Sequence, residues 1–150
     1  MNKSIIKIAG LILMAVLVVS CAPQAATAPA EPAAAEATLT LSGPATGVFW
    51  SMEDLQGLPA TETEYTNKDG ETTTYTGVAF STLLAEAGVE DFISLTLVAA
   101  DDYTADVTAD ELASCPTCIV AFDNGSLRSV MPDLSSKLQV KDLIEIQINQ

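Results

Sequence analysis

The chain has 150 residues, of which 20 are acidic, six are basic and none is histidine, so its formal net charge at pH 7 is −14. This excess of negative charge repels nucleic-acid phosphates and excludes DNA and RNA as partners. The lack of histidine removes the commonest general base, which argues against most acid–base enzymes.

The first 21 residues have the pattern of a bacterial lipoprotein signal. Lys3 and Lys7 precede an apolar run at 8–19, which is shorter than the roughly 20 residues that a membrane-spanning helix needs. The sequence Val-Val-Ser-Cys at 18–21 resembles the lipobox, in which the cysteine thiol takes a diacylglycerol before cleavage. We therefore expect residues 1–20 to be a signal peptide and lipidated Cys21 to anchor the mature protein in the lipid bilayer of the cell membrane, facing the extracytoplasmic side. The alternative is an ordinary secretory signal with a cysteine there by chance.

Residues 21–37 are expected to form a tether. Positions 22–36 hold eight Ala and three Pro, and the prolines interrupt any helix that the alanines favour. Residues 38–150 have the length and apolar content of one globular domain with a single core. They contain eighteen acidic and four basic residues, a formal net charge of −14.

The domain is predicted to begin with two strands and a short helix. Alternating Thr and Leu over 38–42 predict a half-buried strand, and 48–50 predict a second extended segment. Ser51 is a candidate N-cap for a helix with acidic residues in its first turn, and Pro59 ends that helix.

A hairpin, a helix and a strand are predicted next. The threonine-rich stretch 61–76 predicts a hairpin whose turn lies at 67–70. Apolar residues at 80, 83, 84 and 87 have helical spacing, and Gly88 supplies a C-terminal stop. The apolar run 93–99 is typical of a central strand.

The last third is predicted to be mostly strand. Residues 103–107 alternate, and Thr108 and Glu111 have the spacing of a capping box that opens a very short helix. Residues 119–130 predict a hairpin with a tight turn at 123–126. Isoleucines at 144, 146 and 148 alternate with polar residues and predict a final strand with one buried face and one solvent-exposed face. The fold class is therefore α+β, with mixed, mostly antiparallel sheets and a few short helices.

Four stretches of this domain resemble a known family. They are Met-Glu-Asp-Leu-Gln-Gly-Leu-Pro at 52–59, Tyr-Thr-Gly-Val-Ala-Phe-Ser-Thr-Leu-Leu-Ala-Glu-Ala-Gly-Val at 75–89, Ala-Asp-Asp-Tyr at 100–103 and Val-Lys-Asp-Leu-Ile-Glu-Ile at 140–146. In this order they resemble the molybdopterin-binding oxidoreductase domain of sulfite oxidases and their small bacterial relatives, over nearly all of 38–150. The second stretch is similar to a Gly-Val turn that leads into a helix, and Asp102 stands where the family has glycine. The resemblance implies a sulfite oxidase molybdopterin-domain-like fold and a molybdopterin cofactor.

The chain departs from the family at the residues that hold the cofactor. Family enzymes hold molybdenum through a cysteine thiolate shortly before the Gly-Val segment, whereas residues 59–77 contain no cysteine. They bind the cofactor phosphate with His, Arg and Lys, whereas this chain has no His and only Lys68 in the relevant stretch. We therefore expect no cofactor and a non-catalytic binding or accessory domain for an unknown protein or small-molecule ligand. The alternative is a redox protein that uses either molybdopterin or the Cys115/Cys118 pair.

Cys115-Pro-Thr-Cys118 is the one motif with redox character. In an oxidising exterior a pair with this spacing most often forms a local disulfide. A redox-labile pair is the first alternative, although the pair follows a short helix, where the dipole does not lower a thiol pKa. The second alternative is that the two cysteines form half of a metal site, although the sequence has no further Cys or His pair to complete the four ligands of a tetrahedral zinc ion.

Phe49 and Trp50 are adjacent on a predicted strand, so both cannot face the core. A possible ligand groove therefore combines four aromatic residues: Trp50, Tyr65, Tyr75 and Tyr103. The alternative is that the larger ring packs in the core and the other lies at an edge. The acidic residues between 101 and 111 lack the spacing of an EF-hand, so they are expected to be solvated turn and cap residues rather than a metal site.

Overall fold

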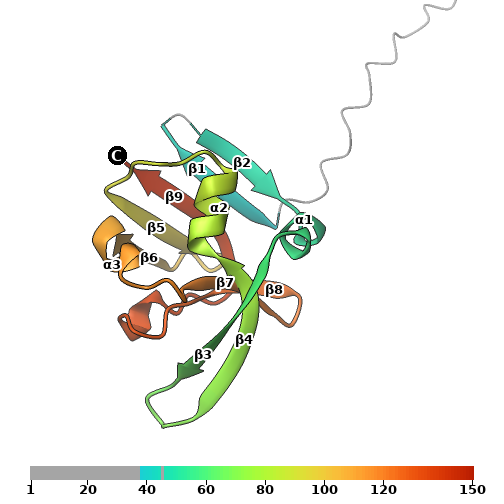
Figure 1. Cartoon of the computed structure of the whole chain (residues 1–150), viewed down its shortest axis with the longest axis vertical. Coiled ribbons are helices and arrows are strands. Elements are labelled where there is room, and N and C mark those ends of the chain that lie inside the picture. Colours follow the sequence, from blue (N-terminus) through green and yellow to red (C-terminus); the bar gives the residue numbers. More distant parts are fainter. Residues whose placement is uncertain (1–37, 45) are drawn as a thin grey trace, which may run out of the picture. The chain divides into compact units, whose positions relative to one another are not determined.

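The computed structural model describes residues 38–44 and 46–150, so the expected signal peptide (1–20), the lipidation site Cys21 and the tether (21–37) lie outside the described residues. Figure 1 shows the elements in chain order. The strands are β1 (Leu39–Gly43), β2 (Thr46–Trp50), β3 (Ala60–Thr66), β4 (Thr72–Ala79), β5 (Ser94–Ala99), β6 (Thr104–Thr108), β7 (Ile119–Asp123), β8 (Ser126–Val130) and β9 (Leu143–Asn149). The helices are α1 (Met52–Gly57), α2 (Phe80–Glu86), α3 (Ala109–Ala113) and the 3-10 turn η1 (Ser136–Leu138). In this described part, no helix is both long and apolar enough to cross a membrane.

Five strands form one sheet in the order β2-β1-β9-β5-β6. Strands β1 and β9, from the two ends of the domain, pair in parallel, and the other neighbours are antiparallel. Side chains alternate across a strand, so every second residue reaches the core. Leu41, Leu97 and Ile146 lie side by side in this way and are each at most 1 % exposed. This arrangement confirms the predicted mixed α+β class.

The other four strands form a second sheet in the order β3-β4-β7-β8. Its β3–β4 hairpin extends away from the rest of the domain (Figure 1), and Asn67 holds the turn by accepting hydrogen bonds from the Asp69 and Glu71 N–H groups at 2.9 and 3.0 Å. The β7–β8 turn has positive φ at Asn124 and Gly125, as a tight two-residue hairpin turn requires. Both predicted hairpins are therefore confirmed.

The helices begin where the sequence predicted. Ser51 and Thr108 are N-caps with complete capping boxes, each closed by the carboxylate three residues later. The Ser51 hydroxyl and N–H both donate to Asp54 and lower the pKa of that carboxyl. The Thr108 N–H and hydroxyl do the same to Glu111, whose pKa is also lowered.

Helix α2 lies over one face of the five-stranded sheet (Figure 1). It follows β4 directly and ends before Gly88, which has φ +68°. Phe80, Leu83 and Leu84 are its buried residues and have the i, i+3, i+4 spacing of one helix face. These side chains pack in the main core with the leucines of the sheet.

Two local predictions are wrong. Ile144 is 45 % exposed, although the alternation predicted that it shares a buried face with Ile146 and Ile148. The register between β5 and β9 shifts here: Val98 lies opposite Glu145 and Ala99 lies opposite Leu143, so Ile144 has no partner in β5. Gly77 lies in the extended strand β4 rather than in a turn. A Cβ at Gly77 would lie 2.1 Å from the carbonyl oxygen of Val120, so the close approach of β4 to β7 requires glycine.

Candidate functional site

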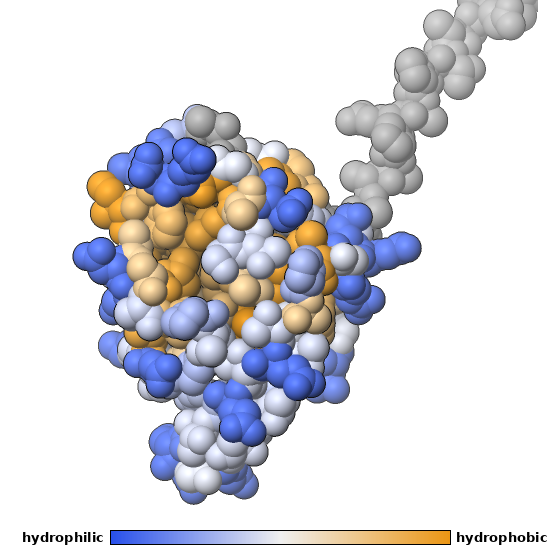
Figure 2. All heavy atoms as spheres, in the orientation of Figure 1, coloured by the Kyte–Doolittle hydropathy of each residue, from blue (hydrophilic) through white to orange (hydrophobic). Residues whose placement is uncertain are grey.

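A hollow that we call the α2–α3 pocket lies between helix α2, helix α3 and the segment 90–92. Its volume is about 550 Å³, and it is lined by residues 80, 81, 84, 90–92, 109, 110, 112, 113, 115, 116 and 118. Figure 2 shows hydrophobic surface in a hollow beside α2, bordered by hydrophilic residues. A pocket of this size and lining matches the sites in which proteins hold small molecules, about 300–1,000 Å³.

Apolar side chains from both helices form much of the pocket lining. Phe80 and Leu84 are one helical turn apart on α2, and Leu112 lies on α3. Phe92 adds a partly buried ring from the loop after α2. These groups also pack in or against the main core, which fixes the lining in place.

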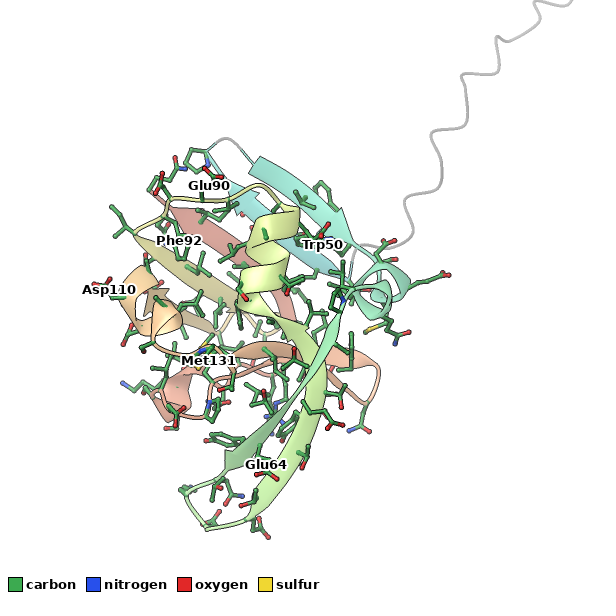
Figure 3. The ribbon with its side chains drawn as sticks, viewed as in Figure 1. Trp50, Glu64, Glu90, Phe92, Asp110 and Met131 are labelled. Atoms are coloured by element: carbon green, nitrogen blue, oxygen red, sulfur yellow. A yellow bond between two sulfur atoms is a disulfide. The ribbon has the colours of Figure 1, made fainter. Side chains whose placement is uncertain are left out.

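Every charged side chain that lines the pocket is acidic. Glu90 and Asp91 lie on the loop after α2, and Asp110 lies in the first turn of α3. In Figure 3, Phe92 lies between Glu90 and Asp110 beside α2. Ile93, which follows Phe92, is 68 % exposed and extends the apolar surface next to the pocket. The pocket thus combines an apolar lining with exposed carboxylates and has no basic side chain in its lining.

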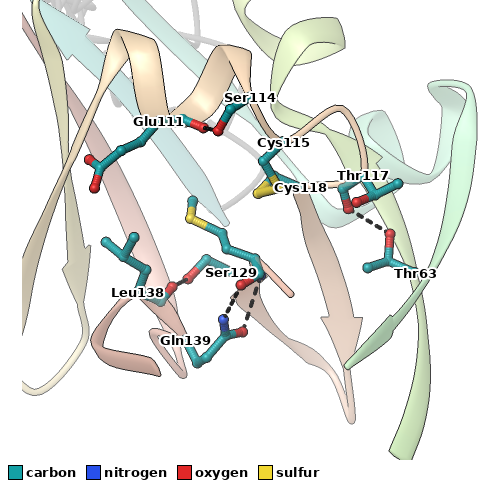
Figure 4. Close-up of a disulfide and its surroundings, with 10 residues drawn as sticks. Thr63, Glu111, Ser114, Cys115, Thr117, Cys118, Ser129, Leu138 and Gln139 are labelled. Carbon is teal, nitrogen blue, oxygen red and sulfur yellow. Dashed lines mark hydrogen bonds between the residues drawn. A yellow bond between two sulfur atoms is a disulfide. The ribbon is translucent and has the colours of Figure 1, made fainter. Parts of the chain in front are cut away.

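The Cys115–Cys118 motif forms a disulfide, and both cysteines line the pocket (Figure 4). Their residues are only 3 % and 2 % exposed. The Thr63 hydroxyl donates to the Thr117 carbonyl at 2.7 Å, and the Phe80 N–H donates to the Cys118 carbonyl at 3.2 Å. The disulfide segment therefore connects α3 with the start of α2 and with β3, and it holds one wall of the pocket. The observed bond is the expected local disulfide, and it is also the oxidised form of a redox-labile pair.

The structure does not bring the four aromatic residues of the expected ligand groove together. Trp50 packs in the main core and is 8 % exposed, while Phe49 beside it is 66 % exposed at the edge strand β2. Tyr65 and Tyr75 pack on a separate small cluster around Ile119, Ala121 and Val130. The Tyr103 hydroxyl donates to the Lys137 carbonyl at 3.0 Å, at a smaller hollow of about 300 Å³. Trp50 lies on a strand of the five-stranded sheet, Tyr65 and Tyr75 lie on the other sheet, and Tyr103 precedes β6, so the four rings do not form one groove.

The basic residues of the described part lie away from the α2–α3 pocket. Arg128 donates to the Tyr75 hydroxyl at 2.9 Å and to Asp123 at 3.1 Å, and its guanidinium lies 5.1 Å from the Tyr75 ring centre. Lys68 lies at the tip of the β3–β4 hairpin, and Lys137 lines the hollow beside Tyr103. Within residues 38–44 and 46–150, no three Cys, Asp or Glu side chains are grouped so that they could hold a metal ion.

These donors do not fit a molybdopterin. Within residues 38–150 both cysteines are used in the disulfide, so the described part offers no free thiolate for molybdenum. Arg128 is paired with Asp123 and lies opposite Lys141 across a β-bridge, while Lys68 lies at a hairpin tip and Lys137 lines another hollow, so no basic residue joins a free thiolate at one site in a domain of formal charge −14. The residues of the described part therefore support no reaction step that uses this cofactor.

Sequence reasoning missed the α2–α3 pocket. It recognised the apolar face of α2 and the disulfide motif, but it did not join them to Glu90, Asp91 and Phe92. The available signal was the polar pair Glu90-Asp91 followed by two large apolar residues, between a helix stop and a strand. That signal does not indicate which other segment of the chain forms the opposite wall of the pocket.

The fold is that of a mixed α+β domain and has a counterpart among solved structures. Among solved structures, sulfane dehydrogenase SoxCD from Paracoccus pantotrophus is similar to this chain, with a TM-score of 0.62 and 21 % sequence identity. The alignment covers 74 % of this chain and 37 % of that chain, so the match spans a little over a third of that protein. No protein-family model and no curated protein sequence matches the chain. The likeness confirms the expected fold, and at this identity it shows the fold alone.

Proposed function

We propose that residues 38–150 are a non-catalytic binding domain whose ligand occupies the α2–α3 pocket. The observation that carries the proposal is this pocket itself, with its fixed apolar lining and its rim of exposed carboxylates. Such a site can hold and orient a ligand through burial of apolar area and through charge. Its lining contains no histidine, free thiol or basic side chain, and its three carboxylates are exposed to solvent.

Loss of molybdenum chemistry is the second part of the proposal. The likeness to sulfane dehydrogenase makes a molybdenum-dependent redox role the natural rival, and the lack of a free thiolate in the described part argues against it. Molybdenum measured by elemental analysis in the protein purified from its own host tests this part. A stoichiometric amount of the metal would contradict it.

Attachment to the membrane is the third part. Acyl chains on Cys21 hold the domain at the extracytoplasmic surface, and residues 21–37 separate it from the bilayer. Mass spectrometry of the mature N-terminus tests this: a diacylglycerol on Cys21 is expected, and an unmodified N-terminus at another residue would contradict it. A Cys21→Ser chain should lose the modification and leave the membrane fraction.

The pocket assignment is tested with the neutral probe 4-phenyl-1-butanol, titrated into the full chain in non-ionic detergent and followed by calorimetry. Ala113→Trp and Ser81→Phe place large rings at two exposed positions that line the pocket, and both should abolish binding. Ala85→Trp is the matched control, because Ala85 is exposed on α2 outside the lining. Binding that survives both blocking variants would refute the pocket as the site.

A redox function is the second candidate, and the position of the disulfide in the pocket wall favours it. A thiol of a partner would attack one cysteine sulfur to give a mixed disulfide and release the other cysteine as a thiolate. A second thiol would then release the first as a new disulfide, which leaves Cys115 and Cys118 reduced by two electrons. Equilibration with glutathione buffers separates the candidates: a pair that is reduced readily supports redox cycling, and a pair that stays oxidised supports a structural bridge.

A further inference from the structure

We infer that the α2–α3 pocket selects a small organic cation, a molecule with an apolar body of about the size of an aromatic ring with a short chain, ending in an ammonium group. The inference rests on the proposed binding role of the pocket and adds the charge and size of the ligand. It is carried by the juxtaposition of Phe80, Leu84 and Phe92 with the carboxylates of Glu90, Asp91 and Asp110.

The apolar part of the ligand follows from the lining. Phe80 and Leu112 are 1 % and 9 % exposed and belong to the core, so they hold the lining in place when the pocket is empty. The accessible apolar surface comes mostly from the less buried lining residues Phe92, Ala109, Ala113 and Pro116. A ring or short alkyl chain placed on this surface gains burial of apolar area on both sides. A volume of about 550 Å³ holds a small molecule of this kind but is small for a folded partner.

The charge of the ligand follows from the rim. The acidic groups come from two elements, with Asp110 on α3 and the Glu90-Asp91 pair on the loop after α2. None of the four basic residues within the described part, Lys68, Arg128, Lys137 and Lys141, lines the pocket. A cation that enters the pocket therefore meets only carboxylates, and an anion meets repulsion from them and from a domain of formal charge −14.

The test uses three probes with the same phenylbutyl body: 4-phenylbutylamine, 4-phenyl-1-butanol and 4-phenylbutyrate, which carry charges of +1, 0 and −1 at pH 7. Each is titrated into the full chain in the same non-ionic detergent. We expect the amine to bind about threefold or more tightly than the alcohol, the size of effect that one exposed ion pair gives, and the carboxylate to bind most weakly. Salt at about 0.5 M should reduce the advantage of the amine and leave the alcohol unchanged.

Two variants assign the effect to the rim. Asp110→Asn should reduce the ratio of the amine's affinity to the alcohol's affinity by about half or more, while the affinity for the alcohol stays the same. Asp69→Asn removes the same charge at the tip of the β3–β4 hairpin and should change neither probe. Equal changes in both variants would mean that the net charge of the domain, and not the rim, attracts the cation, and would overturn the inference.

The outcomes separate this inference from the proposed function. If the alcohol and the amine bind equally and both are blocked by Ala113→Trp and Ser81→Phe, the pocket stands and the cation preference is refuted. If neither probe binds at millimolar concentration, or if the blocking variants change nothing, the proposed function itself fails. If a lysine-rich peptide binds more tightly than the amine and is blocked by the same variants, the ligand is a protein segment and the small-molecule inference is overturned.

Discussion

Replacing Gly77 with alanine is expected to disrupt the contact between β4 and β7. An added Cβ would lie 2.1 Å from the Val120 carbonyl oxygen, 2.5 Å from the Ala121 Cα and 2.7 Å from the Val120 carbonyl carbon. All three are backbone atoms, so no side chain can turn away to make room. Strand β7 must move by more than 1 Å to reach ordinary contact distances of about 3.4 Å, and the pairs that join Gly77 to Ala121 and Val78 to Val120 are strained as it does.

The magnitude follows from this displacement. Forcing extra carbon into a packed interior costs typically about 1–3 kcal/mol, and a clash with backbone places Gly77→Ala at or above the upper end, at about 3 kcal/mol. With an m-value of about 1.5 kcal/mol per M of urea, the unfolding midpoint should fall by about 2 M. The control is Gly47→Ala, because a Cβ at Gly47 in β2 meets nothing within 4 Å. It should be neutral or stabilise by up to about 1 kcal/mol through the lower entropy of the unfolded chain. If the two variants unfold at the same urea concentration, the close approach of β4 and β7 is not real.

Three further predictions concern the disulfide and the helix caps, each followed by urea unfolding of the full chain. The double variant Cys115→Ala/Cys118→Ala should lose about 2 kcal/mol of unfolding free energy, the loop-closure entropy of a four-residue loop, and an unchanged midpoint would show that the bridge adds nothing to stability. Thr108→Ala removes the N-cap of α3 and should cost about 1 kcal/mol, whereas Thr104→Ala, at an exposed strand position nearby, should cost less. Asp54 and Glu111 have pKa values lowered by their capping hydrogen bonds, so their contribution to stability is complete above their ordinary pKa of about 4 and is lost as the pH falls through the lowered folded-state values. The Asp54→Asn/Glu111→Gln chain should therefore lose less stability than the parent between pH 6 and pH 3, and equal losses would contradict this assignment.

The sequence by itself determined the local structure, because the interactions that start and stop an element join residues a few positions apart. Ser51 with Asp54 and Thr108 with Glu111 close their capping boxes three residues away, and Gly88 and Asn124-Gly125 have the positive φ that their turns require. Alternation and helical spacing then placed most strands and helix α2. The spacing of Cys115 and Cys118 was also enough to predict a local disulfide.

Only the tertiary structure decided which segments meet. The exposure of Ile144 depends on a register shift between β5 and β9, which pair residues about 50 positions apart, so the alternation in β9 alone could not reveal it. The aromatic groove failed for the same reason: the predicted hairpin joins Tyr65 and Tyr75, but no local pattern says that Trp50 and Tyr103 belong to other parts of the fold. The α2–α3 pocket brings residues 80–92 against residues 109–118. Such contacts depend on how the whole chain buries its apolar surface. The apolar pattern of a segment shows which face is buried, but the hydrophobic effect is non-directional and does not specify which other segment covers that face.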